Sequence, residues 1–290
     1  MFTTMTDNKT LRCGNYHTHT RHCDGHGEPR EFAEAALRKD MPRLGFSGHN
    51  VVPFATDWTM PAERLDDYLR EVRETREQYR GRVEIYLGME VDFIAGIISP
   101  VHPGIRALDL DFIIGSVHFI GPEDGDHAWT VDGPRAELEQ AIAQGFAGQA
   151  RLLVERYYRL LGTMALTATP DIIGHFDVVK KNNRDAELFR EDEDWYQAAV
   201  KNALEAVRES GSIMEINTGG VVRNTSGAYY PSPWILREAC QMHIPVMINA
   251  DAHYPENIDG KFSEAAALLR EAGYRAQRQL TAAGWNEIPL

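Results

Sequence analysis

Short runs of apolar, β-prone residues alternate along the chain with longer segments in which apolar residues recur at helical spacing. This alternation is typical of repeated strand–helix units and not of a β-sandwich or a helical bundle. It predicts seven strands, at residues 11–17, 43–49, 83–90, 112–118, 172–175, 213–217 and 245–251. It also predicts helices near residues 28–39, 62–80, 134–164, 192–210, 233–242 and 255–272. The sequence therefore indicates an α/β fold.

Each predicted strand ends in, or runs directly into, a side chain that can bind a metal ion. These side chains are His17 with His19, His49, Glu90, His118, His175, Asn217, and Asp251 with His253. In a closed parallel α/β barrel the carboxyl ends of all strands meet on one face, which hosts the active site. One histidine at a strand end is more often a packing residue than a ligand, but this many together favour a metal centre.

The number of candidate ligands exceeds what one tetrahedral ion can use, so the sequence predicts two to three divalent ions. Nitrogen and oxygen ligands without thiolate suit Zn²⁺, Mn²⁺ or Fe²⁺. The Gly-containing loop at residues 21–27 follows the first histidine pair and offers a further ligand. We expect His26 to be that ligand, with Asp24 as the alternative.

Three cations lie close to the predicted strand ends. Lys180 and Lys181 follow the strand that ends at His175, and Arg223 follows Gly219 and Gly220. Most exposed lysine pairs are only solvated charge. In a chain of net charge −13, however, cations at the metal face suit the binding of a phosphate group.

Composition and charge narrow the class of protein. The chain has 290 residues, with 30 Lys and Arg against 43 Asp and Glu, which argues against an extended nucleic-acid-binding surface. Its three cysteines are too few for a disulfide framework, and no apolar run approaches the ~18 residues of a membrane span. We expect a cytoplasmic protein with no membrane partner, a flexible tail at residues 1–10 and one domain at residues 11–290.

Several motifs carry a family resemblance. HTH (17–19), FSGH (46–49), GME (88–90), IGSVH (114–118), IGH (173–175) and DAH (251–253) resemble the polymerase-and-histidinol-phosphatase (PHP) superfamily. GSVHF (115–119), EINTG (215–219) and YPSPW (230–234) resemble the histidinol-phosphatases within it. One departure stands out, because Gly48 occupies a position where relatives commonly have Asp.

The resemblance implies a distorted seven-stranded (β/α)7 TIM-like barrel with a trinuclear metal site at the carboxyl ends of the strands. It implies the metal ligands His17, His19, His26, His49, Glu90, His118, His175, Asp251 and His253, with Glu90 as a bridge between two ions. The implied activity is hydrolysis of L-histidinol phosphate to L-histidinol and phosphate, a step of histidine biosynthesis.

For the reaction we expect a hydroxide held between two ions to attack phosphorus while Arg223, Lys180 and Lys181 offset the phosphoryl charge. Asp251, Glu90 and His253 are the expected catalytic residues, and Asp251 or a water protonates the leaving alkoxide. The first alternative is a PHP-type phosphoesterase that acts on another small phosphate ester or a nucleotide. A non-catalytic metal-binding barrel and an amidohydrolase are further alternatives. The sequence leaves the oligomeric state open.

Overall fold

A curved sheet of six parallel strands forms the centre of the molecule. The computed structural model describes residues 13–121, 128–223 and 226–290, and the expected tail at residues 1–10 lies outside this part of the chain. The strands of the sheet are β1 (Arg43–Phe46), β2 (Glu84–Asp92), β3 (Phe112–Ser116), β6 (Ile172–Ile173), β7 (Ile213–Asn217) and β8 (Val246–Asn249). They follow the order β1-β2-β3-β6-β7-β8, and every neighbouring pair is parallel. The predicted α/β class is thereby confirmed.

The seventh expected strand, at residues 11–17, is not formed as a strand in the described chain. Asn15 and Thr18 instead make isolated parallel bridges, to Leu44 in β1 and to Ala252 shortly after β8. The Asn15 side chain explains the interruption, because its amide donates to the His17 carbonyl at 3.1 Å and accepts from the Ala250 N–H at 2.9 Å. Such side-chain bonds replace ladder bonds between strands. The sheet is therefore a six-stranded half-barrel whose two ends are linked by single bridges.

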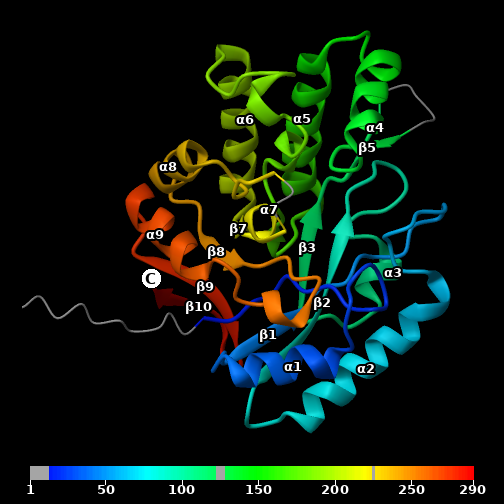
Figure 1. The fold of residues 1–290 in the computed structure, drawn as a ribbon, viewed down its shortest axis with the longest axis vertical. Coiled ribbons are helices and arrows are strands. Elements are labelled where there is room, and N and C mark those ends of the chain that lie inside the picture. The colour runs from blue at the N-terminus through cyan, green and yellow to red at the C-terminus, as the bar shows by residue number, and fades with distance from the viewer. Residues whose placement is uncertain (1–12, 122–127, 224–225) are drawn as a thin grey trace, which may run out of the picture.

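Helices pack around the outside of the sheet (Figure 1). The longer ones are α1 (Pro29–Arg38), α2 (Leu65–Gln78), α5 (Ala150–Ala168), α6 (Asp194–Ser210), α8 (Pro233–Gln241) and α9 (Phe262–Ala272). Short helices are α3 (Pro103–Arg106), α4 (Arg135–Gln140) and α7 (Gly219–Val222). Each longer helix matches a segment with helical periodicity, because its apolar side packs on the sheet or on a neighbouring helix.

The single helix expected at residues 134–164 is divided in the structure. A π-helical turn at Ala141–Gly145 follows α4, and α5 then begins at Ala150. The two are separated where Ala147 and Gly148 adopt positive φ angles of 51° and 73°. A left-handed backbone cannot continue a right-handed helix, so the apolar periodicity spans two separate helices.

A C-terminal hairpin, β9 (Ala276–Thr281) and β10 (Gly284–Pro289), covers one end of the curved sheet. Leu280 joins an interior cluster with Tyr16, Phe112, Ile172 and other buried side chains. Tyr16 also donates a hydrogen bond from its hydroxyl to the Leu280 carbonyl at 2.6 Å. Since Phe112 and Ile172 are the first residues of their strands, this apolar plug fills the amino ends of the strands and leaves the carboxyl ends for a site.

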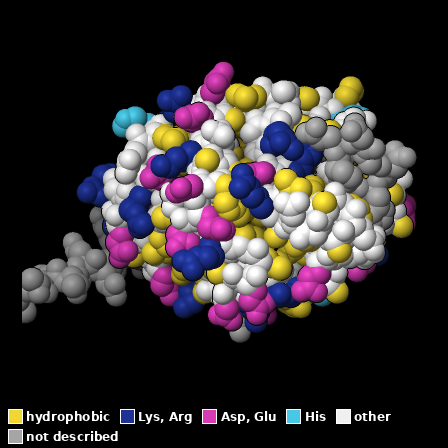
Figure 2. Space-filling view, turned by 90° about the horizontal axis from the view of Figure 1, so that it is seen from above, with side chains coloured by type: hydrophobic (Ala, Val, Ile, Leu, Met, Phe, Trp, Pro, Cys, Tyr) yellow, Lys and Arg dark blue, Asp and Glu magenta, His cyan; other side chains and the backbone are white. Residues whose placement is uncertain are grey.

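Two observations concern the surface. In the described residues no helix is long and apolar enough to cross a membrane. On the face seen in Figure 2, acidic and basic side chains are interspersed with apolar ones.

Candidate metal centre

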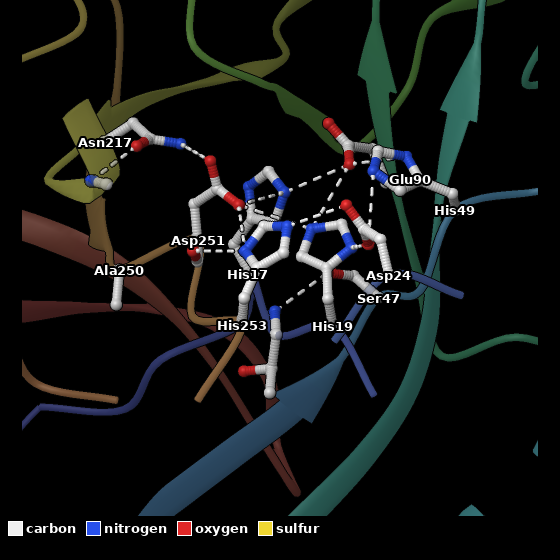
Figure 3. Close-up of polar contacts among 12 residues, drawn as sticks. His17, His19, Asp24, Ser47, His49, Glu90, Asn217, Ala250, Asp251 and His253 are labelled. Carbon is white, nitrogen blue, oxygen red and sulfur yellow. Dashed lines mark hydrogen bonds and ion pairs between the residues drawn. The ribbon is translucent and has the colours of Figure 1, made fainter. Parts of the chain in front are cut away.

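Histidine and carboxylate side chains from distant parts of the chain converge at the carboxyl ends of the strands (Figure 3). Four groups of side chains could each hold a metal ion. Within each group, the ligand atoms all lie within 4.8 Å of one another. The groups are His19, Asp24, His49 and His253; His17, His19 and Asp251; His49, Asp92 and His118; and Glu90, His118 and His175. Shared members join the four groups into one cluster.

Glu90 lies at the centre of this cluster. Its Oε2 atom faces three imidazole nitrogens: His17 Nε2 at 3.2 Å, His19 Nε2 at 3.4 Å and His49 Nδ1 at 3.1 Å. Its Oε1 atom faces two: His175 Nε2 at 2.9 Å and His118 Nε2 at 3.6 Å. The two oxygens of one buried carboxylate thus face two different sets of histidines.

These atoms fit divalent metal ions. Several are buried and have no hydrogen-bond partner among the described residues: His17 Nε2, His19 Nε2, His49 Nδ1 and Asp24 Oδ1. A buried polar atom without a partner is costly, and cations bound within these groups would supply the missing partners. Two atoms bonded to one tetrahedral ion at about 2.1 Å lie about 3.4 Å apart. The separation of His19 Nε2 from Asp251 Oδ1, 3.3 Å, matches that value.

The structure brings Asp24 into the cluster and leaves His26 outside it. Asp24 Oδ2 lies 3.0 Å from His253 Nε2, and Asp24 Oδ1 lies 3.4 Å from His19 Nδ1. The exposed His26 ring instead stacks on Tyr254 at 4.4 Å, and the His26 N–H donates to the His253 carbonyl. Asp24, the alternative, is therefore among the grouped candidate ligands, and His26 is not.

A second layer of carboxylates holds the histidines in place. Glu215 Oε1 lies 2.7 Å from His17 Nδ1, and Asp92 Oδ1 lies 2.9 Å from His118 Nδ1. Such hydrogen bonds fix the ring and direct its other nitrogen to a metal. The Asn217 amide, expected as a strand-end ligand, supports this layer. It donates to Glu215 at 2.9 Å and to Asp251 at 3.3 Å.

The sequence pattern did not single out Glu215 and Asp92 as functional residues. Each stands two residues from a candidate that it did identify, Asn217 and Glu90, on the same strand. Side chains at i and i+2 share one face of a strand, so this spacing was the signal that could have found them.

The electrostatics of the site favour bound positive charge. Burial alone would lower the pKa of His17, but the carboxylates of Glu215, Glu90 and Asp251 outweigh it and raise this pKa to about 10. Burial likewise opposes ionisation of Glu90, yet the surrounding histidines hold the pKa of its carboxyl well below the ordinary value. Buried carboxylates that stay ionised create a strong field that a divalent cation would neutralise.

The three candidate phosphate-binding cations have different surroundings. Arg223 lines the cavity, and its guanidinium donates to Asp251 Oδ2 at 2.8 Å and to His253 Nδ1 at 3.0 Å. Lys181 also lines the cavity. Lys180 is not among the lining residues; it is buried and pairs with Asp177 at 2.8 Å. The neighbouring lysines therefore point to different places, because they lie in a tight 3₁₀ turn.

A cavity of about 230 Å³ opens onto the cluster. Its walls outside the metal groups include Trp58, Thr130, Asp132, Val178 and Tyr230. Thr130 is the last residue of β5 (Trp129–Thr130), which pairs with β4 (Phe119–Ile120), and Asp132 follows β5 by two residues. The lining thus combines charged, hydroxyl and aromatic groups beside the candidate ligands.

Neighbouring side chains pack closely against Gly48, the residue before His49. A Cβ atom built on Gly48 would lie 3.3 Å from Cys23 Sγ and 3.3 Å from Met60 Cε. The Gly48 N–H donates to the Tyr68 hydroxyl at 3.3 Å, which itself donates to the Gly88 carbonyl at 2.8 Å. Other side chains therefore occupy the space beside this glycine, and Tyr68 links the segment after β1 to β2.

Comparisons with known proteins point in the same direction. The model of the PHP domain family matches residues 15–219. The "Probable histidinol-phosphatase" of Deinococcus radiodurans is 33% identical over 265 residues, covering 89% of this chain and 93% of that protein. The histidinol-phosphatase of Bacillus subtilis is 28% identical over 254 residues, covering 82% of this chain and 92% of that protein.

A solved structure shares the fold. The histidinol phosphate phosphatase from Lactococcus lactis, complexed with zinc, L-histidinol and phosphate, superimposes with a TM-score of 0.67 at 18% identity. The match covers 95% of this chain and 99% of that one.

Proposed function

Because the chain belongs to the PHP domain family, we propose that it is a metal-dependent phosphatase that hydrolyses L-histidinol phosphate to L-histidinol and phosphate. One observation carries the chemistry: unpartnered, buried histidine and carboxylate atoms face a cavity that Arg223 and Lys181 also line. The names of the two relatives indicate the substrate, and the match spans nearly the full length of both proteins.

We propose that two to three divalent ions bind the four groups, in which Asp92 orients His118 and the other members are the ligands. Glu90 is the candidate bridge, because its two oxygens face different histidines. Asp24 takes the position first expected for His26. Nitrogen and oxygen donors without thiolate suit zinc, manganese and iron(II). The zinc in the Lactococcus lactis structure makes zinc the first ion to test.

When bound, such ions supply Lewis-acid chemistry, neutralising charge on the phosphoryl oxygens and lowering the pKa of water to about 7. The chain's own residues place the ester. A guanidinium has five N–H donors, and the contacts of Arg223 with Asp251 and His253 leave donors for a phosphate oxygen. Lys181 adds a second positive charge at the wall of the same cavity.

The reaction breaks the P–O bond of the ester and forms a P–O bond to water, which yields phosphate and the free alcohol. The leaving alkoxide must gain a proton. Asp251 was one candidate donor, but its ion pair with Arg223 at 2.8 Å holds the pKa of Asp251 well below the ordinary value although burial opposes this. An ionised carboxylate has no proton to give. Water, the other candidate, is therefore the donor in this proposal.

A substrate panel tests the proposal. Metal-replete enzyme would be assayed for phosphate release from L-histidinol phosphate beside nucleoside monophosphates, sugar phosphates and p-nitrophenyl phosphate. We expect kcat/KM for L-histidinol phosphate to exceed the others by at least about 10²-fold, since a site built around a substrate's polar groups rejects esters that lack them. A higher kcat/KM for a nucleotide or sugar phosphate would favour the alternative of a different PHP-type phosphoesterase.

A further inference from the structure

Asp132 differs from the other carboxylates that line the cavity. Among the described residues, the lining carboxylates are Asp24, Glu90, Asp132 and Asp251. Three of these belong to the candidate metal groups, and Asp132 does not. Its role is therefore not explained by the metals.

The position of Asp132 is fixed by its neighbours on both sides. The Val131 N–H donates to the His118 carbonyl at 2.8 Å, which ties this segment to a candidate metal ligand. The Asn182 amide donates to the Gly133 carbonyl at 2.8 Å, which ties it to the turn that carries Lys181. Hydrogen bonds to the backbone of the residues on either side thus hold Asp132 beside the metal cluster.

The pairing of Asp132 with Lys181 is unfavourable for a site that binds phosphate alone. Lys181 Nζ lies 3.2 Å from Asp132 Oδ2, and about a quarter of each side chain is exposed. A carboxylate at this distance cancels much of the attraction that the lysine would exert on a phosphate dianion. The arrangement becomes favourable when the ligand itself carries a positive charge close to its phosphate.

L-Histidinol phosphate has this charge distribution, because its ammonium group lies on the carbon next to the one that bears the phosphate ester. We propose, on the basis of the proposed function, that Asp132 binds the substrate ammonium and selects phosphate esters with an amine at this position. A carboxylate offers about four acceptor positions, and Lys181 uses one of them. Thr130 beside it lines the same cavity and has a buried hydroxyl oxygen without a hydrogen-bond partner among the described residues.

The test pairs two substrates with two enzymes. L-Histidinol phosphate and its des-amino counterpart, 3-(imidazol-4-yl)propyl phosphate, differ only in the ammonium group. We expect Asp132→Asn to lower kcat/KM for L-histidinol phosphate by about 30- to 100-fold, because a charged hydrogen bond in the cavity is lost. The value for the des-amino ester should change by less than about 3-fold, which also shows that the variant is folded.

Two further variants and a binding measurement complete the experiment. Asp132→Glu, which keeps the charge, should retain part of the preference for the amine. Asp259→Asn, which removes a carboxylate paired with Lys39 outside the cavity, should leave both values unchanged. The inhibition constant of L-histidinol should rise in Asp132→Asn in proportion to the lost kcat/KM.

The outcomes separate this inference from the proposed function. Wild-type enzyme without activity on L-histidinol phosphate overturns the proposed function, and the role of Asp132 with it. Wild-type activity with equal losses on the two esters in Asp132→Asn overturns the ammonium site and makes Asp132 only a support for Lys181. Unchanged kcat/KM for both esters removes Asp132 from substrate binding.

Discussion

The Nδ1 atom of His17 lies 2.7 Å from Oε1 of Glu215, and both side chains are fully buried. The other ring nitrogen, Nε2, is thereby directed toward Glu90 and has no hydrogen-bond partner among the described residues. Glu215 Oε1 also accepts a hydrogen bond from the Asn249 amide at 3.0 Å, and Oε2 accepts from the His175 N–H at 2.8 Å. One carboxylate on β7 therefore orients a candidate ligand that lies 198 residues away in the sequence.

Glu215→Gln should lower metal affinity by about 10- to 100-fold, because it removes the charge that orients His17 and raises its basicity. Competition with a chelator of known affinity measures this. The matched control is Glu71→Gln, which alters a histidine–glutamate pair with His22 at 2.9 Å outside the centre. Equal metal affinity in wild type and Glu215→Gln, with both folded by circular dichroism, would contradict the role of Glu215.

Asp24→Asn and His26→Asn should have opposite outcomes. Asp24 offers buried oxygen to the group with His19, His49 and His253, so we expect Asp24→Asn to lose bound metal and at least about 10-fold in kcat/KM. His26 stacks on Tyr254 at the surface, so His26→Asn should keep its metal and stay within about 3-fold of wild type. Elemental analysis and kinetics of the two variants decide, and metal loss in His26→Asn alone would restore His26 as the ligand.

Arg223→Ala should lower kcat/KM by about 10²-fold, which corresponds to about 2.7 kcal/mol of transition-state stabilisation. Arg223→Lys should fall between, because lysine keeps the charge but loses the planar fork. Both are to be measured at matched metal occupancy, since Arg223 also contacts Asp251 and His253. Values within about 3-fold of wild type for both variants would remove Arg223 from phosphate binding.

Substitution of Lys180 should mainly lower stability, and substitution of Lys181 should mainly lower activity. Lys180→Met leaves the buried Asp177 carboxylate without its cation and should lower the free energy of unfolding by about 3–5 kcal/mol. Lys181→Met removes the partly exposed ion pair with Asp132 and should lower the free energy of unfolding by about 1 kcal/mol or less. It should instead lower kcat/KM by about 10-fold through the lost phosphate contact. Urea unfolding and kinetics on both variants test this, and a reversed pattern would show that their roles are exchanged.

Metal removal should abolish activity and lower Tm together. The ligand atoms fill more than one coordination sphere, so elemental analysis of protein purified without chelators should give more than one transition-metal ion per chain. Dialysis against a chelator leaves buried carboxylates and unpartnered nitrogens without their cation, and a ligand that binds only the native state raises Tm. Added zinc or manganese should restore both readings. Full activity after complete metal removal would contradict a metal-dependent reaction.

The sequence by itself determined the strand–helix alternation and most of the candidate ligands. Glu90, His118 and His175 stand at or just beyond the ends of apolar runs, and parallel strands bring such ends together whatever the details of packing. The pairs at residues 17 and 19 and at residues 251 and 253 were visible from their spacing, but neither pair lies in a strand of the structure, and Asp251 adopts a positive φ angle of 50°. These features depend on periodicity alone.

The tertiary structure decided which way individual side chains point and which distant residues they contact. Asp24 enters the cluster and His26 leaves it because the loop is fixed by a hydrogen bond to His253, far away in the sequence. Lys180 is buried against Asp177 while Lys181 reaches the cavity. Neighbouring positions in a loop or a tight turn share composition and charge, but backbone dihedral angles and long-range contacts direct their side chains to different surroundings, and no local pattern encodes that choice.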